Sequence, residues 1–155
     1  GVMYRPHLVK YITDSKTGER RMIEPEPFRT LPWKPEHIET IKKAMVGVNT
    51  EGTGKRAFAG AEYVSGGKTG TAQGFSLRGS EYKANRLRKD LHDHALFIAF
   101  APAEQPKIAL AVLVENGGFG AQSAAPIARM VIDYYLLGKT PDGPAKDDEV
   151  QEEED

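Results

Sequence analysis

The sequence predicts an α/β fold of the α+β type, in which an antiparallel sheet is flanked by helices. Two apolar runs, at 95–101 and 108–115, are separated only by Ala103 to Lys107, and so short a connection indicates an antiparallel hairpin. Apolar residues recur at helical spacing both before and after these runs. At 155 residues the chain is long enough for one domain with a buried core.

The first predicted elements are a small hairpin and a proline-rich connector. Segments 8–13 and 21–24 flank a polar turn at 14–19 and read as the two hairpin strands. The connector that follows is expected to be extended because it holds four prolines, Pro25, Pro27, Pro32 and Pro35.

A helix is predicted over 36–48. Pro35 suits the first position of a helix, and four apolar residues then recur at helical spacing: Ile38, Ile41, Met45 and Val48. A glycine-rich break at 49–54, one helical turn at 55–60 and a strand within 61–75 are expected next.

Two further strands and a closing helix complete the prediction. The run at 95–101 is apolar throughout, which suggests burial on both faces. The run at 108–115 alternates large side chains (Ile108, Leu110, Val112, Val114) with Ala109, Ala111 and Leu113, and its smaller side would let a helix approach closely. The closing helix is expected to end at Gly138. Its one apolar stripe, interpreted as core, consists of Ile127, Met130, Val131, Tyr134 and Leu137.

Charge is unevenly distributed although the net charge is only −1. Residues 145–155 hold seven acids and one lysine, so we expect a domain over 1–140 and an acidic, disordered tail over 141–155. A basic cluster consists of Arg78, Lys83, Arg86, Arg88 and Lys89. It is interrupted by acids and has few aromatic neighbours, so a solvated loop is favoured over a nucleic-acid surface.

Several kinds of site are not supported by the sequence. The absence of cysteine excludes disulfides and thiolate metal ligands. His92 and His94 have no third ligand at a recognisable spacing, so no metal site and no cofactor are predicted. From these residues we expect neither a membrane-spanning stretch nor a signal peptide.

The most informative run is Ser65-Gly66-Gly67-Lys68-Thr69-Gly70-Thr71-Ala72-Gln73. Thr69 and Thr71 would point to one face of a strand, and Gly70 between them would let a ligand backbone lie close to the strand edge. With the Lys68 cation beside them, these residues suit a short, extended ligand that carries a carboxylate.

This run resembles the third active-site motif of penicillin-binding transpeptidases and serine β-lactamases. The Thr-Ala-Gln extension is typical of the class B, cell-wall branch. The later segments follow in the family's order: a strand at 94–102, a strand that ends in Glu115-Asn116-Gly117-Gly118, and a helix at 122–138. Over about residues 5–138 the order and spacing are most similar to the elongation-specific members, the penicillin-binding proteins 2. The triplet alone would be weak, because Lys16-Thr17-Gly18 repeats it in a polar turn.

The family's other two motifs, Ser-x-x-Lys and Ser-x-Asn, precede this strand and are not found in this sequence. Ser65-Gly66-Gly67-Lys68 overlaps the strand motif and has glycines where a helix should start. Ser80-Glu81-Tyr82-Lys83 lies downstream, where Ser80 is better interpreted as a helix N-cap. We therefore expect the chain to be the C-terminal part of a transpeptidase domain that begins after the nucleophile, in a fold with a five-stranded sheet and a helical subdomain.

The resemblance implies roles for the strand residues. Lys68 would shape the electrostatics near the nucleophile and its proton relay. Thr69, Gly70 and Thr71 would form the substrate-binding strand, in which the two threonine hydroxyls bind the substrate carboxylate. The Thr71 backbone N–H would form half of the oxyanion hole. The implied partners are the D-alanyl-D-alanine end of a peptidoglycan stem peptide, β-lactam antibiotics, the N-terminal remainder of the same protein and other cell-wall synthesis proteins. The implied location of the whole protein is the periplasmic face of a bacterial inner membrane.

Three other functions were weighed. A β-lactamase or β-lactam-sensor fragment would share the Lys68 strand, and a non-catalytic binding module could keep the fold without the chemistry. The Thr-Ala-Gln extension, the long insertion before His94 and the ending at Gly118 favour the transpeptidase. A phosphate-binding loop would need glycine at position 62, which is Glu62.

Overall fold

A computed structural model of the chain describes residues 1–73, 92–140 and 143–144. They form two compact units, the first ending at Ile41 and the second beginning at Lys42. The basic cluster, Ser80 and all of the predicted tail except Gly143 and Pro144 lie outside the described residues. In the part of the chain that is described, no helix is both long and apolar enough to cross a membrane.

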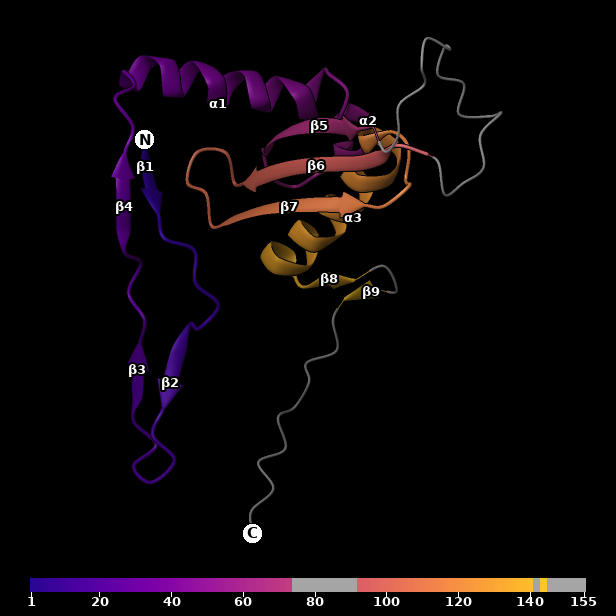
Figure 1. Cartoon of the computed structure of the whole chain (residues 1–155). Helices are drawn as coiled ribbons and strands as arrows, with labels where there is room; N and C mark the ends of the chain where they lie inside the picture. The colour runs from indigo at the N-terminus through magenta and orange to yellow at the C-terminus, as the bar shows by residue number, and fades with distance from the viewer. Residues whose placement is uncertain (74–91, 141–142, 145–155) are drawn as a thin grey trace. The chain divides into compact units, whose positions relative to one another are not determined.

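The first unit contains two antiparallel strand pairs (Figure 1). β2 (Tyr11–Thr13) pairs with β3 (Arg20–Met22), which confirms the predicted hairpin. β1 (Val2–Tyr4) pairs with β4 (Pro27–Thr30), a strand inside the segment that was expected to be only an extended connector. Pro27 is the first residue of β4, where the missing N–H is tolerated.

The Lys16-Thr17-Gly18 triplet forms the hairpin turn. One carboxylate oxygen of Asp14 accepts hydrogen bonds from the backbone N–H groups of Lys16 at 2.8 Å and Thr17 at 3.1 Å. These bonds hold the pKa of the Asp14 carboxyl below its ordinary value. Gly18 adopts a left-handed conformation at φ 71°, which glycine tolerates. This second Lys-Thr-Gly copy is therefore a turn, as its polar neighbours predicted.

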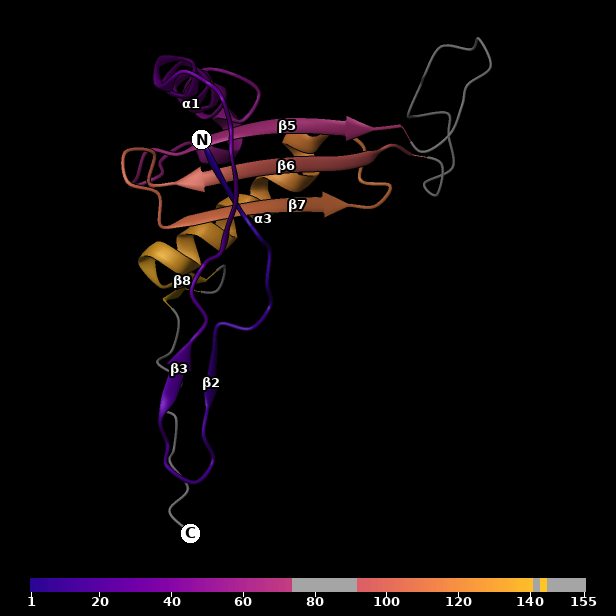
Figure 2. The same cartoon turned by 60° about the vertical axis from the view of Figure 1, so that its left-hand side comes forward.

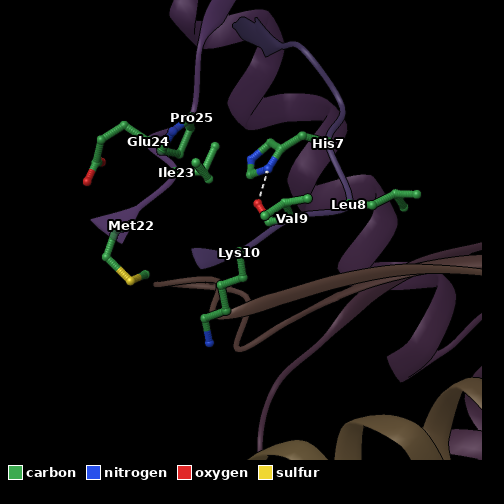
Figure 3. A pocket seen from close by; sticks show the side chains of 8 residues that line it. All are labelled: His7, Leu8, Val9, Lys10, Met22, Ile23, Glu24 and Pro25. Atoms are coloured by element: carbon green, nitrogen blue, oxygen red, sulfur yellow. Dashed lines mark hydrogen bonds between the residues drawn. The ribbon is translucent and has the colours of Figure 1, made fainter. Parts of the chain in front are cut away.

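The same unit has a shallow pocket of about 320 Å³ at the base of the hairpin (Figure 3). Two chain segments line it, from His7 to Lys10 and from Met22 to Pro25. The His7 ring nitrogen Nδ1 lies 2.8 Å from the Val9 carbonyl oxygen and so is used within the hairpin itself. None of the predicted site residues lines this pocket.

Two helices precede the main sheet in the chain. α1 (Pro35–Thr50) starts at the proline that suits this position and confirms the predicted helix, although Ile41 of its apolar set is 53% exposed. α2 (Lys55–Phe58) is the single turn expected there.

The second unit is built on a three-stranded antiparallel sheet with the order β5-β6-β7. The strands are β5 (Gly66–Ala72), β6 (His94–Ala101) and β7 (Ile108–Val114). Helix α3 (Gly120–Leu137) lies against one face of this sheet in both views (Figures 1 and 2). The predicted antiparallel sheet with flanking helices is confirmed.

The core lies between α3 and the sheet and is made largely of small residues. Every second residue of β6 is at most 3% exposed: Ala95, Phe97, Ala99 and Ala101. The facing residues of α3 are fully buried: Ala124, Ala125, Ala128 and Ile132. Because alanine occupies so many of these positions, the helix backbone can approach the sheet closely.

The large residues of β7 pack on this same core, namely Ile108, Leu110, Val112 and Val114. The prediction that the small side of β7 faces a helix is therefore wrong, since Ala109, Ala111 and Leu113 are exposed. β6 is likewise not buried on both faces, because Ile98 is 47% exposed. On the face of the sheet opposite α3, Ile98 and Leu113 are 47% and 58% exposed.

The apolar stripe of α3 is also not core. Its members Ile127, Met130, Val131 and Tyr134 are between 37% and 58% exposed, whereas the opposite, alanine-rich side of the helix is buried. α3 ends as predicted: Gly138 is left-handed, at φ 64°, and its N–H donates to the Tyr134 carbonyl at 3.0 Å. The short strands β8 (Lys139–Thr140) and β9 (Gly143–Pro144) then pair with each other.

Candidate active site

The predicted site residues Lys68, Thr69, Gly70 and Thr71 all lie on β5, the edge strand of the sheet. Thr69 and Thr71 pair with Phe97 and Ala95 of β6, so the two threonines share the α3 face of the sheet, as the alternation predicted. Lys68 pairs with Ile98 and lies on the opposite face.

Lys68 is exposed, and its ammonium donates a 2.7 Å hydrogen bond to the Thr69 carbonyl oxygen. The side chain therefore turns back along its own strand, and its charge lies close to the backbone that carries the two threonines. An anion at this part of β5 would find a cation and two hydroxyl groups within four consecutive positions of one strand.

Two aromatic rings of β6 cover the glycines that begin β5. A Cβ atom added to Gly66 would lie 2.4 Å from the Phe100 ring, and one added to Gly67 would lie 2.6 Å from the Phe97 ring. Alternate residues of β6 point to opposite faces, so each ring lies where a β5 side chain would otherwise be. Glycine is therefore required at both positions for the strand to fit against β6.

The first residue of α3 makes a similarly close approach to Gly70. A Cβ atom on Gly120 would lie 2.2 Å from the Leu96 carbonyl oxygen and 2.6 Å from that of Gly70. Gly70 thus separates the two threonines at the point where the start of α3 comes against the backbone of β5.

Asn49 and Ser65 form a buried polar pair at the start of β5. Asn49, near the end of α1, is 5% exposed, and its amide Nδ2 donates a 2.9 Å hydrogen bond to the Ser65 hydroxyl. Ser65 is itself only 3% exposed. A serine this inaccessible is not a nucleophile for a substrate, in agreement with the interpretation of Ser65-Gly66-Gly67-Lys68 as part of the strand.

Thr53 is a neighbour of the site that the sequence did not single out. It lies on the turn between α1 and α2, and its hydroxyl oxygen is 3.0 Å from that of Thr69. The Gly52-Thr53-Gly54 run, a hydroxyl residue between two glycines, is a recognisable pattern in the sequence. Its separation from Lys68 along the chain gave no indication that Thr53 would lie beside Thr69.

His94 makes a structural contact through one ring nitrogen. Its ring nitrogen Nδ1 accepts a 2.9 Å hydrogen bond from the backbone N–H of Asn116, which joins the start of β6 to the turn after β7. Asn116 adopts a positive φ of 52°, a conformation that asparagine tolerates better than most residues.

The Lys68 strand lies within a segment that matches a known protein family. Residues 1–133 match the family model of the penicillin-binding protein transpeptidase domain. The chain belongs to this family. The resemblance that the Lys68 run and the later strands predicted is confirmed.

Individual members of the transpeptidase family show the same relationship. The chain is 41% identical to the peptidoglycan D,D-transpeptidase MrdA of Haemophilus influenzae over 148 residues, which cover 91% of this chain and 22% of that protein. It is similar to the crystal structure of Pseudomonas aeruginosa PBP2 in complex with WCK 5153, with a TM-score of 0.61 and 33% identity over 97% of this chain and 29% of the other.

The penicillin G acyl-enzyme complex of penicillin-binding protein A from M. tuberculosis is also similar. Its TM-score is 0.61 and its identity 30%, over 88% of this chain and 28% of the other. The chain thus spans between a fifth and a third of the length of these relatives.

Proposed function

We propose that this chain supplies the Lys68–Thr71 strand of a peptidoglycan D,D-transpeptidase, which cross-links stem peptides through an acyl-serine intermediate and is acylated by β-lactams. The observation that carries the proposal is an edge strand of a transpeptidase-family fold that presents Thr69 and Thr71 on one face, while the Lys68 ammonium, from the other face, bonds to the Thr69 carbonyl oxygen. The relatives named D,D-transpeptidases favour this function over a β-lactamase or β-lactam sensor.

The reaction assigns a role to each strand residue. A serine outside this sequence would attack the carbonyl of the penultimate D-alanine and release the terminal D-alanine, and an amine of a neighbouring stem peptide would then take the acyl group. Lys68 would stabilise negative charge near the nucleophile, while the Thr69 and Thr71 hydroxyls would donate hydrogen bonds to the substrate carboxylate across Gly70. The Thr71 N–H would supply half of the oxyanion hole, where one donor contributes about 2.7–4 kcal/mol.

The same proposal covers partners and location. β-Lactams would occupy the position of the D-alanyl-D-alanine end, and the N-terminal part of the domain would supply the nucleophile. Other cell-wall synthesis proteins are proposed as partners of the whole enzyme. Its substrate would place it at the periplasmic face of the bacterial inner membrane. No nucleic acid and no cofactor are required.

Labelled penicillin tests the proposal directly. The 155-residue chain alone should form no covalent adduct, and mixing it with the part of the domain that carries Ser-x-x-Lys and Ser-x-Asn should restore labelling. A stable adduct on Ser65 or Ser80 of the isolated chain would contradict the assignment of both as non-nucleophilic. A complete protein that is never acylated would contradict the proposed activity itself.

A further inference from the structure

The contact between Thr53 and Thr69 joins two segments that are sixteen positions apart in the chain. A hydroxyl group carries one proton and can both donate and accept, so the partner of a hydroxyl decides where its proton points. If Thr53 donates to Thr69, the Thr69 proton is left to point at a ligand. If Thr53 were apolar, the Thr69 hydroxyl would rotate without this constraint.

The turn that carries Thr53 is fixed by its own backbone. The Gly52 N–H donates to the Gly47 carbonyl at 2.8 Å, and the Gly54 N–H donates to the Val48 carbonyl at 2.9 Å. Both residues flanking Thr53 are therefore tied to the last turns of α1, and Thr53 is exposed between them.

The Asn49 side chain fills the space between this turn and β5. A Cβ atom on Gly54 would lie 2.4 Å from Asn49 Oδ1, and one on Gly67 would lie 3.0 Å from the same atom. Gly54 follows Thr53, and Gly67 lies two residues before Thr69. With its Nδ2 bonded to Ser65, the buried amide keeps the turn and the strand at a constant separation.

We propose that Thr53 is a positioning residue of the carboxylate site: its hydroxyl directs the Thr69 proton towards the ligand, and the buried Asn49 amide holds the two threonines together. This inference rests on the proposed function, because it assigns Thr69 to a ligand carboxylate. It adds a third hydroxyl, from outside β5, to the residues that determine how a ligand is held.

The test uses the complete parent protein and compares two probes. One is a fluorescent penicillin with its free carboxylate, and the other is the methyl ester of the same compound, which lacks the charge that Thr69 would bind. Thr53→Val should slow acylation by the free acid about three- to tenfold, the loss expected for one ordinary hydrogen bond. It should change the rate with the ester less than about twofold. Thr53→Ser, which restores the hydroxyl, should recover the wild-type rate.

Thr50→Val is the matched control, because the Thr50 hydroxyl donates to the Val46 carbonyl within α1 and has no part in the proposed site. Its acylation rate should be unchanged. Thr53→Val in a Thr69→Val background should have no further effect, since Thr53 acts through Thr69.

Each other outcome overturns the inference. An equal loss with both probes would mean that Thr53 only supports the local structure, and an unchanged rate would mean that it does not act on the site. An additive effect of the two valines would show that Thr53 contacts the ligand independently of Thr69. If Thr69→Val slows acylation and Thr53→Val does not, the proposed function stands and only this inference fails. A wild-type protein that penicillin never acylates overturns both.

Discussion

The Tyr63 hydroxyl donates a 2.7 Å hydrogen bond to Oδ1 of Asp133, a residue of α3 that lies seventy positions further along the chain. The single Nε–H of Arg129 is shared between the two carboxylate oxygens of Asp133, with Nε 2.8 Å from Oδ1 and 2.7 Å from Oδ2. The Arg129 guanidinium in turn lies 5.8 Å from the centre of the Tyr63 ring and donates to the Ala59 carbonyl at 3.2 Å. These contacts connect α3 to the segment that leads into β5.

Replacing Tyr63 by phenylalanine should destabilise the chain through this network. The substitution keeps the ring but removes a donor to a charged acceptor, so we expect the free energy of unfolding to fall by about 1.5 kcal/mol. Tyr135→Phe is the control, because Tyr135 is 59% exposed, and its effect should stay within about 0.5 kcal/mol. Urea denaturation of the three proteins measures the difference. Equal stabilities of all three would contradict a structural role for the bond.

Stability should also fall at high pH because of Tyr63. Burial, followed by the hydrogen bond and charge of Asp133, raises the pKa of the Tyr63 hydroxyl above its ordinary value of 10.0. The folded chain therefore keeps this proton at a pH where the unfolded chain loses it. The contribution is complete below about pH 10 and is lost as the pH rises above that value. Unfolding measured between about pH 9 and about pH 11 should show a shallower decline in Tyr63→Phe than in the wild type.

Thr69→Val and Thr71→Val should each slow acylation of the complete enzyme by penicillin. Valine keeps the shape of threonine but removes a hydrogen bond to the carboxylate, worth about 1.5–3 kcal/mol when charge-assisted, which corresponds to about ten- to a hundredfold or more. Thr40→Val serves as the control, since the Thr40 hydroxyl donates to the Glu36 carbonyl in α1. Stopped-flow acylation rates give the comparison, and unchanged rates in both variants would remove these threonines from the site.

The sequence was sufficient to predict the shared face of Thr69 and Thr71, because a strand alternates strictly and both residues lie in one strand. It could not predict the Thr53–Thr69 contact, which depends on the path of the chain through the turn at 51–54 and on a buried amide that fixes that path. The assignment of Ile127, Met130, Val131 and Tyr134 to the core failed for a related reason. Helical spacing shows that a face is apolar, but α3 has a second, alanine-rich face, and the sheet packs on that one. Likewise, the all-apolar run at 95–101 could not reveal that Ile98 is exposed in this chain.

The isolated chain should self-associate. β7 is an edge strand of the described sheet, and Leu113 and Ile98 are 58% and 47% exposed on the face opposite α3. An edge next to exposed apolar side chains favours pairing with another chain. Sedimentation velocity at rising concentration should show species larger than a monomer, and Leu113→Lys should shift the distribution towards the monomer. A wild-type chain that stays monomeric, with strongly protected amides along β7, would contradict this expectation.

Two glycine-to-alanine substitutions should have opposite effects. Gly120→Ala would place a methyl group 2.2 Å from the Leu96 carbonyl oxygen, so we expect a loss of about 1–3 kcal/mol as α3 and β5 move apart. Gly47→Ala lies within α1, where the new methyl would meet only Glu51, at an ordinary 3.6 Å. It should stabilise the chain by about 0.4–1 kcal/mol by restricting the unfolded state. Thermal unfolding of both variants gives the comparison. A Gly120→Ala variant as stable as the wild type would mean that the close approach of Gly120 to the sheet does not limit residue 120, and a destabilised Gly47→Ala variant would contradict the expectation for α1.

The aromatic rings over Gly66 and Gly67 have a consequence for the entropy of binding. Glycine is the residue with the most backbone freedom to lose, and here that freedom is already lost when Phe97 and Phe100 pack on β5. A short peptide that lies along the edge of β5 would give up its own mobility, about 1–2 kcal/mol per ordered residue. The β5 strand itself would lose little further backbone entropy. Because β5 is already ordered in the folded chain, its ordering would not reduce the free energy of binding, and contacts with a small ligand would contribute mainly to affinity.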